Sequence, residues 1–154
     1  MKDNLNISIY IQIMGNSISA QKINFEDMQT IYKNPESYIL INTLSESEQH
    51  CLIRNTISPQ QEEALMNKFL KNGNKSVRII VYGRNCNDET ANKKYEQLLK
   101  HGFVNSHIYI GGLFEWLMLQ DIFGTDEFPT TSKQLDILKY KPGKRLNIAL
   151  LENG

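Results

Sequence analysis

Short apolar runs and segments of helical periodicity alternate along the middle of the chain. A continuous apolar run at residues 38–41 predicts a strand that is buried on both faces. Residues 77–82 predict the strongest strand, and residues 104–110 predict another. Helical spacing predicts four helices, which cover residues 24–34, 59–73, 90–102 and 111–124. Alternating strands and helices joined by short crossovers require a parallel sheet covered on both faces. The pattern therefore predicts a single α/β domain.

The ends of these helices carry recognisable residues. Asn24 can cap the first helix, which Asn34-Pro35 ends. Pro59 suits the first turn of the second helix, and Asn72-Gly73 suits its end. His101 is expected to cap the C-terminus of the third helix.

Both ends of the chain are less regular. Isoleucines at positions 7, 9, 11 and 13 alternate with polar residues, a pattern that fits an added edge strand or a peripheral tail. The segment after Phe128 contains Pro129 and Pro142, and one short helix is expected at residues 133–138. We expect tails here rather than a second domain, because 154 residues suit one compact domain.

The charge balance bears on possible partners. Lys plus Arg and Asp plus Glu each total 17, so the formal net charge is zero and no overall attraction to nucleic acid or acidic lipid is expected. A local patch is compatible with that balance, and the densest basic cluster is Lys139, Lys141, Lys144 and Arg145. This cluster is too short and isolated for a nucleic-acid arm, so no nucleic-acid partner is expected.

Cysteine and histidine usage argues against a disulfide framework and a metal centre. Two cysteines, Cys51 and Cys86, are fewer than a secreted, disulfide-stabilised domain normally carries. The spacing of the cysteines and of the three histidines does not match a zinc site (His50, His101 and His107). No apolar run approaches the roughly 18 residues of a membrane span, and the N-terminus lacks a secretory pattern. An intracellular, cytoplasmic location is expected, with no metal and no cofactor.

One motif depends on where translation begins. Residues 14–19 (MGNSIS) match the N-myristoylation pattern M-G-x-x-x-[ST]. The acyl chain is attached to a free N-terminal glycine, so Gly15 is a lipidation site only if translation starts at Met14. Otherwise the segment is a polar loop. Membrane association is expected only with acylation, and one acyl chain alone gives marginal binding.

Two longer segments resemble a known family. Residues 79–89 (IIVYGRNCNDE) join a buried strand to a helix, and residues 101–116 (HGFVNSHIYIGGLFEW) lead on to the next strand and helix. Together they resemble the rhodanese-like (sulfurtransferase) domain, in which a Gly-Gly-x-x-x-Trp turn follows a helix ending in Gly-Phe-x-Asn. The resemblance covers about residues 20–125 and implies a three-layer sandwich with a mainly parallel sheet flanked by helices. Residues 1–19 are then an N-terminal extension or tail, and residues 126–154 a C-terminal extension.

This chain differs from the family at the positions that hold the family's catalytic residues. Active members have a nucleophilic cysteine directly after the strand, and that position here is Gly83. The family's Asp-x-Arg after the earlier strand is here residues 42–44 (Asn-Thr-Leu). Arg84 matches the basic residue that often follows the cysteine, and Cys86 lies three residues after Gly83.

The loop after this strand is the candidate site. A loop that curls onto a helix N-terminus turns backbone N–H groups inward, where they and the helix dipole stabilise an anion. Cys86 would have to turn inward from mid-loop, with Asp88 and Glu89 disfavouring its thiolate and Arg84 favouring it. Arg84 could instead clamp an oxyanion, or pair on the surface with Asp88 or Glu89. The candidate binding residues are Gly83, Arg84, Asn85, Asn87, Asp88 and Glu89.

The remaining notable residues have structural interpretations. Cys51 is expected to be a semi-buried thiol, and Trp116 a core residue beneath the loop. Gly111-Gly112 are expected to serve backbone conformation and close packing. His50 is expected to be solvated like His101, and the strand histidine at position 107 to be structural.

Two functions are open. The first is a catalytically degenerate rhodanese-like module that binds an unknown protein partner or a small sulfur-containing anion. The second is an active thiosulfate or persulfide sulfurtransferase in which Cys86 carries the persulfide. A phosphatase of the same fold would need a cysteine at the loop's start and an arginine at its end, and the chain has neither.

Overall fold

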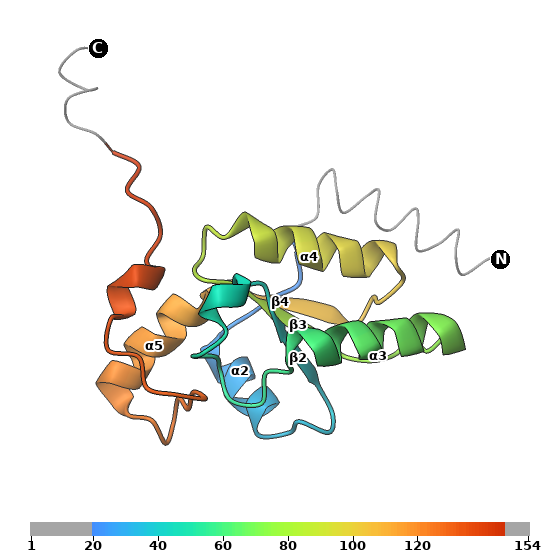
Figure 1. The fold of residues 1–154 in the computed structure, drawn as a ribbon, viewed down its shortest axis with the longest axis horizontal. Helices are drawn as coiled ribbons and strands as arrows, with labels where there is room; N and C mark the ends of the chain where they lie inside the picture. The colour runs from blue at the N-terminus through green and yellow to red at the C-terminus, as the bar shows by residue number, and fades with distance from the viewer. Residues whose placement is uncertain (1–19, 147–154) are drawn as a thin grey trace, which may run out of the picture.

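Four parallel strands form the centre of the molecule (Figure 1). The computed structural model describes residues 20–146, and the isoleucines at positions 7–13 lie outside them, so the added edge strand stays a prediction. The strands are β1 (Lys22–Ile23), β2 (Ile39–Asn42), β3 (Ile79–Tyr82) and β4 (Ser106–Tyr109). Their order in the sheet is β1-β4-β3-β2, and every neighbouring pair is parallel.

The predicted helices form within a few residues of their expected bounds. They are α2 (Phe25–Tyr32), α3 (Pro59–Asn72), α4 (Glu89–Lys100) and α5 (Gly112–Phe123). The Asn24 side chain accepts a hydrogen bond from the Asp27 backbone and completes a capping box, which fixes the start of α2. Gly73 ends α3 at φ 72°, a left-handed conformation that favours glycine.

The prediction of a short helix at residues 133–138 is wrong. A single 3-10 turn, η2 (Ile137–Tyr140), forms slightly later in the chain. Only Ile137 and Tyr140 pack against the core, and their i, i+3 spacing fits one 3-10 turn better than a longer amphipathic α-helix. A second such turn, η1 (Glu46–Glu48), follows β2.

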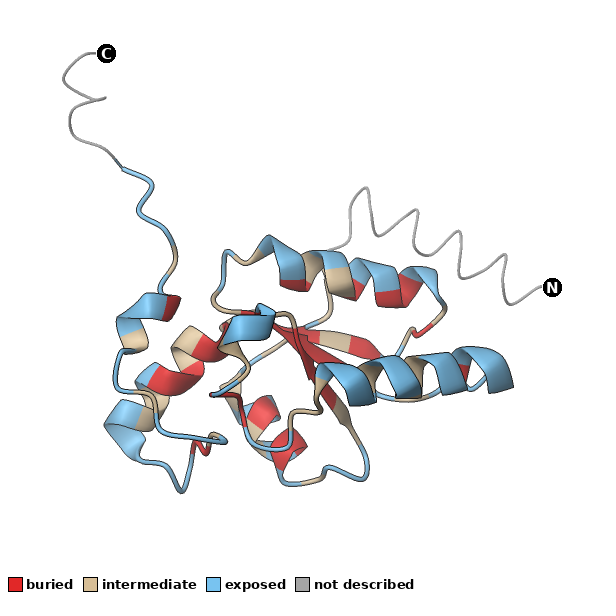
Figure 2. Cartoon of the chain, viewed as in Figure 1, coloured by how far each residue is buried: buried red, intermediate tan, exposed pale blue. Residues whose placement is uncertain are grey.

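The sheet separates two apolar cores, as a three-layer sandwich requires. Ile80 and Tyr82 of β3 face the core formed with α2 and α5, whereas Ile79 and Val81 face the core formed with α3 and α4. This division follows from the period of two along a strand, which sends successive side chains to opposite faces. Figure 2 shows most of β2, β3 and β4 buried and the outer surfaces of the helices exposed. The predicted α/β sandwich with a parallel sheet is confirmed.

Residues 128–140 fold back onto the α2 and α5 side of the sheet. The Phe128 ring packs edge-on against Trp116 with centroids 5.0 Å apart, and the Trp116 indole N–H donates to the Pro129 carbonyl at 3.1 Å. Trp116 and Tyr140 are both fully buried, which confirms the core role expected for Trp116. Between residues 20 and 146, no helix has the length and apolar character needed to cross a bilayer.

Candidate functional site

The loop between β3 and α4 closes against the N-terminus of α5. The backbone N–H of Leu113 donates to the Gly83 carbonyl at 2.9 Å, and that of Phe114 donates to the Arg84 carbonyl at 2.8 Å. The first N–H groups of a helix have no partner within the helix. These two bonds therefore pair free N–H groups at the start of α5 and also hold the loop in place. The loop therefore lies at the carboxyl ends of the parallel strands, where ligands of α/β sheets commonly bind.

Gly112 allows this close approach. Its φ is +68°, and a Cβ built on it would lie 2.8 Å from both the Asn85 nitrogen and the Gly83 oxygen. Both atoms belong to the backbone, so neither can move aside without shifting the loop. The expectation that Gly111-Gly112 serves backbone conformation and close packing is confirmed at Gly112.

Glu115, one turn into α5, connects this helix to the sheet. Its Oε1 accepts a hydrogen bond from the Tyr109 hydroxyl at 2.7 Å. Burial, and then the hydrogen bond to and negative charge of Glu115, raise the pKa of Tyr109 far above its ordinary range. Tyr109 is therefore a neutral donor that fixes the start of α5 to the end of β4.

The Asp88 carboxylate occupies the inside of the loop. Its Oδ2 accepts a hydrogen bond from the Arg84 backbone N–H at 2.8 Å, and its Oδ1 accepts one from the Thr90 N–H at 3.0 Å. A Cβ at Gly83 would overlap Asp88 Oδ2 and lie only 2.8 Å from Asp88 Cγ. The space next to Gly83 is thus filled by a carboxylate from the same loop, which also caps α4.

Cys86 lies on the outer side of the loop. It is exposed, and its thiol makes a weak contact with Asn87 Oδ1 at 3.8 Å. The N–H of Arg84 in the loop and that of Thr90 in the first turn of α4 donate to Asp88 and not to the sulfur. Cys86 as a sulfur carrier stays a prediction, as does the role of Asn87 and of Glu89, which begins α4.

Arg84 is held by groups distant in the sequence. Its guanidinium forms an ion pair with Glu48 of η1, donates to the Lys139 carbonyl, and lies over the Tyr140 ring at 5.1 Å. The expected alternative of a surface pair with Asp88 or Glu89 is wrong. Asp88 turns inward to accept from backbone N–H groups, which leaves Glu48 as the acidic partner.

The C-terminal segment covers the loop from outside. The Asn85 side-chain amide donates to the Tyr140 carbonyl at 2.9 Å. The Tyr140 side chain is fully buried, and its hydroxyl has no hydrogen-bond partner among residues 20–146. Sequence reasoning missed Glu48, Lys139 and Tyr140 as neighbours of the loop, because no local signal links segments so far apart in the chain.

A comparison with protein-family models identifies the domain. The model described as "Rhodanese-like domain" matches residues 37–119, more than half of the chain. The chain belongs to the rhodanese-like domain family. The matched residues include β2, β3, β4 and most of α5, so they contain the whole candidate loop.

Two solved structures align with this chain. The Alr3790 protein from Anabaena sp. aligns at a TM-score of 0.53 and 19% identity, over 76% of this chain and 97% of that one. The single-domain sulfurtransferase RDL2 from Saccharomyces cerevisiae aligns at a TM-score of 0.46 and 18% identity, over 72% of this chain and 97% of that one. No curated protein matches the sequence.

Asn42 shapes the loop that follows β2 and contains η1. Asn42 is buried at the end of β2, and its Oδ1 accepts from the Leu44 N–H at 3.0 Å and from the Gln49 amide at 2.8 Å. These bonds position η1 and therefore Glu48, the partner of Arg84. The resemblance places an aspartate of the family at this position. In this chain Asn42 stands there, and its neutral amide has a structural role.

The second cysteine and the histidines lie apart from the loop. Cys51 is fully buried rather than semi-buried, its thiol donates to the Ser132 carbonyl at 3.3 Å, and burial raises its pKa. His50 and His101 are exposed as expected, and His101 is the C-terminal cap of α4. In the part of the chain that the structure describes, no group of His, Cys, Asp and Glu could hold a metal ion.

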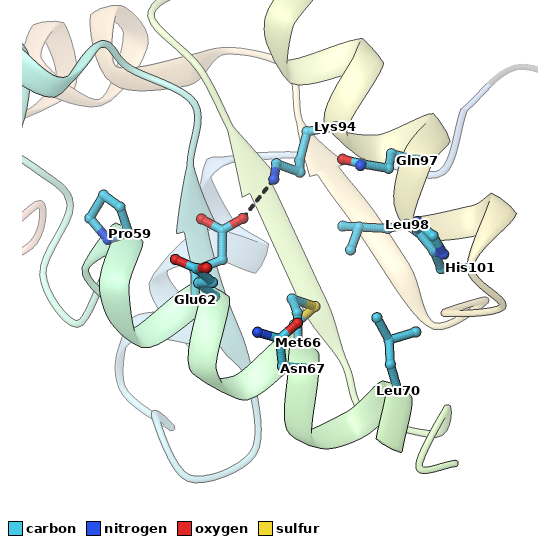
Figure 3. Close-up of a pocket in the computed structure, with 10 residues that line it drawn as sticks. Pro59, Glu62, Met66, Asn67, Leu70, Lys94, Gln97, Leu98 and His101 are labelled. Atoms are coloured by element: carbon cyan, nitrogen blue, oxygen red, sulfur yellow. Dashed lines mark hydrogen bonds and ion pairs between the residues drawn. The ribbon is translucent and has the colours of Figure 1, made fainter. Parts of the chain in front are cut away.

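An open groove of about 390 Å³ lies between α3 and α4 (Figure 3). An ion pair between Glu62 and Lys94 joins the two helices at 2.7 Å, and Met66 and Leu98 add apolar surface. None of the residues that line this groove belongs to the loop that follows β3. The groove is therefore separate from the candidate site.

Proposed function

We propose that this rhodanese-like protein does not transfer sulfur and instead acts as a binding or regulatory module. The observation that carries the proposal is the Asp88 carboxylate beside Gly83. It occupies the space that a side chain at position 83 would enter, and it already accepts the Arg84 N–H. An anion held by the protein itself thus replaces the thiolate or persulfide that such a loop would otherwise stabilise.

The surroundings of Arg84 favour a protein partner over a small sulfur-containing anion. A guanidinium that clamps an oxyanion must direct free N–H groups towards it. Here one terminal nitrogen is paired with Glu48 and the other donates to the Lys139 carbonyl. The Glu48 carboxylate beside the guanidinium would repel an incoming anion, so the loop supports recognition of a protein surface better than capture of a free anion.

A sulfurtransferase that uses Cys86 is the second candidate, and the exposure of this thiol favours it. In that reaction the Cys86 thiolate would attack the sulfane sulfur of thiosulfate, forming a persulfide and releasing sulfite. Cyanide would then remove the outer sulfur as thiocyanate and restore the thiolate. An exposed thiol can meet both reagents, although the backbone N–H groups of Arg84 and Thr90 donate to Asp88.

Thiocyanate production separates the two candidates. The protein is incubated with thiosulfate and cyanide, beside Cys86→Ser and Cys51→Ser variants. We expect no turnover above a protein-free blank in any of the three. Turnover that persists in Cys51→Ser and disappears in Cys86→Ser would overturn the non-catalytic proposal.

The location of the protein is a proposal that rests on the sequence. We propose an intracellular protein that is tethered to membranes when translation begins at Met14 and Gly15 is acylated. If translation begins at Met14, intact-mass measurement of the protein from its own cells should show Gly15 as the first residue, with the added mass of one myristoyl group. A native N-terminus at Met1 would exclude the tether.

A further inference from the structure

The segment at residues 133–146 has an inner and an outer side. Ile137 and Tyr140 pack against the core of α2 and α5, with Tyr140 fully buried. Leu135 and Leu138, in contrast, are 82% and 61% exposed. Single exposed leucines are ordinary on protein surfaces, but these two lie on one short segment whose inner side is already committed to the core.

Basic side chains accompany the exposed leucines. Lys139, Lys141, Lys144 and Arg145 are all exposed, and Asp136 is the one acidic residue between positions 133 and 146. The ion pairs found within residues 20–146 are Arg84–Glu48 and Lys94–Glu62, so none of the four forms an ion pair with a described carboxylate. A chain with no formal net charge therefore has a local excess of positive charge here.

Contacts with the loop hold Lys139 and Tyr140 of this segment in place. The Lys139 carbonyl accepts from Arg84, and the Tyr140 carbonyl accepts from Asn85 at 2.9 Å. Turning Leu138 inward would require breaking these bonds and removing Tyr140 from the core. These contacts thus keep Leu138 exposed in a segment whose lysines and arginine are also exposed.

We propose that residues 133–146 form a docking surface for an anionic lipid membrane. Acidic headgroups attract the lysines and arginine, and leucine side chains enter the boundary between headgroups and acyl chains. A nucleic acid would pair with the charges but would leave the leucines in water. It would also find no exposed aromatic ring between positions 133 and 146 on which a base could stack, because Tyr140 is buried.

This surface supplies what the myristoylation motif lacks by itself. One acyl chain gives marginal, reversible membrane binding, whereas an acyl chain combined with a basic patch gives a stable anchor. The basic surface does not depend on the acyl chain, so it can be tested on the unmodified protein.

Vesicle co-sedimentation of the full, unacylated chain tests the proposal. We expect binding to phosphatidylcholine vesicles that contain phosphatidylserine, little binding to phosphatidylcholine alone, and release by salt. Lys141→Glu combined with Lys144→Glu should weaken binding by about tenfold or more. The matched control is Lys68→Glu combined with Lys71→Glu on α3, which makes the same change in net charge at exposed positions and should bind as the parent does.

A leucine variant distinguishes membrane docking from simple charge attraction. Leu138→Ser removes an exposed side chain, so thermal unfolding should be unchanged while vesicle binding falls. Equal binding to neutral and anionic vesicles, no binding to either, or equal losses in the α3 control would overturn the proposal. Preferential binding to a single-stranded RNA, unaffected by Leu138→Ser, would overturn it in favour of nucleic acid.

Discussion

Two glycines meet at the candidate site, and their surroundings differ in kind. Gly112 faces backbone atoms of the loop, whereas Gly83 faces the side chain of Asp88. The first contact is built into the fold, since the Leu113 and Phe114 N–H groups bind the loop carbonyls directly beside it. The second depends on one carboxylate. Backbone contacts therefore fix the shape of the loop, whereas a single side chain, that of Asp88, fills the space at its centre.

The largest expected effect comes from Gly112→Ala. An added Cβ meets backbone at 2.8 Å and sits at φ +68°, so we expect a loss of about 3 kcal/mol in the free energy of unfolding, measured in urea. Gly73→Ala is the matched control, because its φ is +72° and nothing lies within 4 Å of the added atom. It should cost about 1 kcal/mol. Equal losses in the two variants would show that the backbone contact does not matter.

Gly83→Cys should cost less, about 2 kcal/mol, because the Asp88 carboxylate can move away from the new side chain. Asp88→Ala alone should cost about 1 kcal/mol through the lost cap of α4. The double variant should be more stable than the sum of the two losses predicts, by about 1 kcal/mol. Additive losses would mean that Asp88 does not fill the space beside Gly83.

The same pair of variants sharpens the functional proposal. With Asp88 removed, a thiolate at position 83 can receive the Arg84 N–H, so the double variant should be alkylated faster by iodoacetamide than Gly83→Cys alone. Cys86→Ser in both backgrounds isolates the new thiol. Identical rates in the two proteins would contradict the idea that the carboxylate occupies an anion cradle.

Alkaline pH should destabilise the fold moderately. Burial raises the pKa of Cys51 above 9.0 and the pKa of Tyr82 and Tyr109 above 10.0. The unfolded chain therefore releases these protons first, and the free energy of unfolding should fall as the pH rises through about 9 to 10. Urea titrations across this range test the fall, which Cys51→Ala should make shallower. A flat profile would contradict the buried, neutral state of these groups.

The smallest effect is expected at Glu48. The Arg84–Glu48 side chains are 31% and 24% exposed, so Glu48→Gln should cost less than about 1 kcal/mol. Hydrogen exchange should nevertheless quicken in residues 137–140, because Arg84 also binds the Lys139 carbonyl. Glu62→Gln, which breaks the Lys94 pair at the α3–α4 groove, is the control and should leave that exchange unchanged.

Local signals were enough for the fold and were not enough for the site. The apolar run of β3 and the caps Asn24 and Gly73 depend on nearby residues, so they could be predicted from the sequence. The two residues of β1 could not, because their pairing with β4 arises from tertiary structure alone. A resemblance to the family pointed to Gly83 as the unusual position.

What fills the loop required the structure. Asp88 lies next to Gly83 because the chain turns back on itself, and its charge alone does not reveal whether it points inward or outward. Glu48 and Lys139 reach Arg84 across 36 and 55 positions of sequence. Contacts of that separation leave no periodic pattern, so neither the ion pair nor the covering segment could be predicted.

Intact-mass spectrometry after incubation with thiosulfate tests the central claim most directly. The Asp88-filled loop predicts that the native protein gains no mass. A cyanide-removable gain equal to one sulfur atom, located on Cys86 by peptide mapping and absent from Cys86→Ser, would contradict the claim and establish a sulfur carrier.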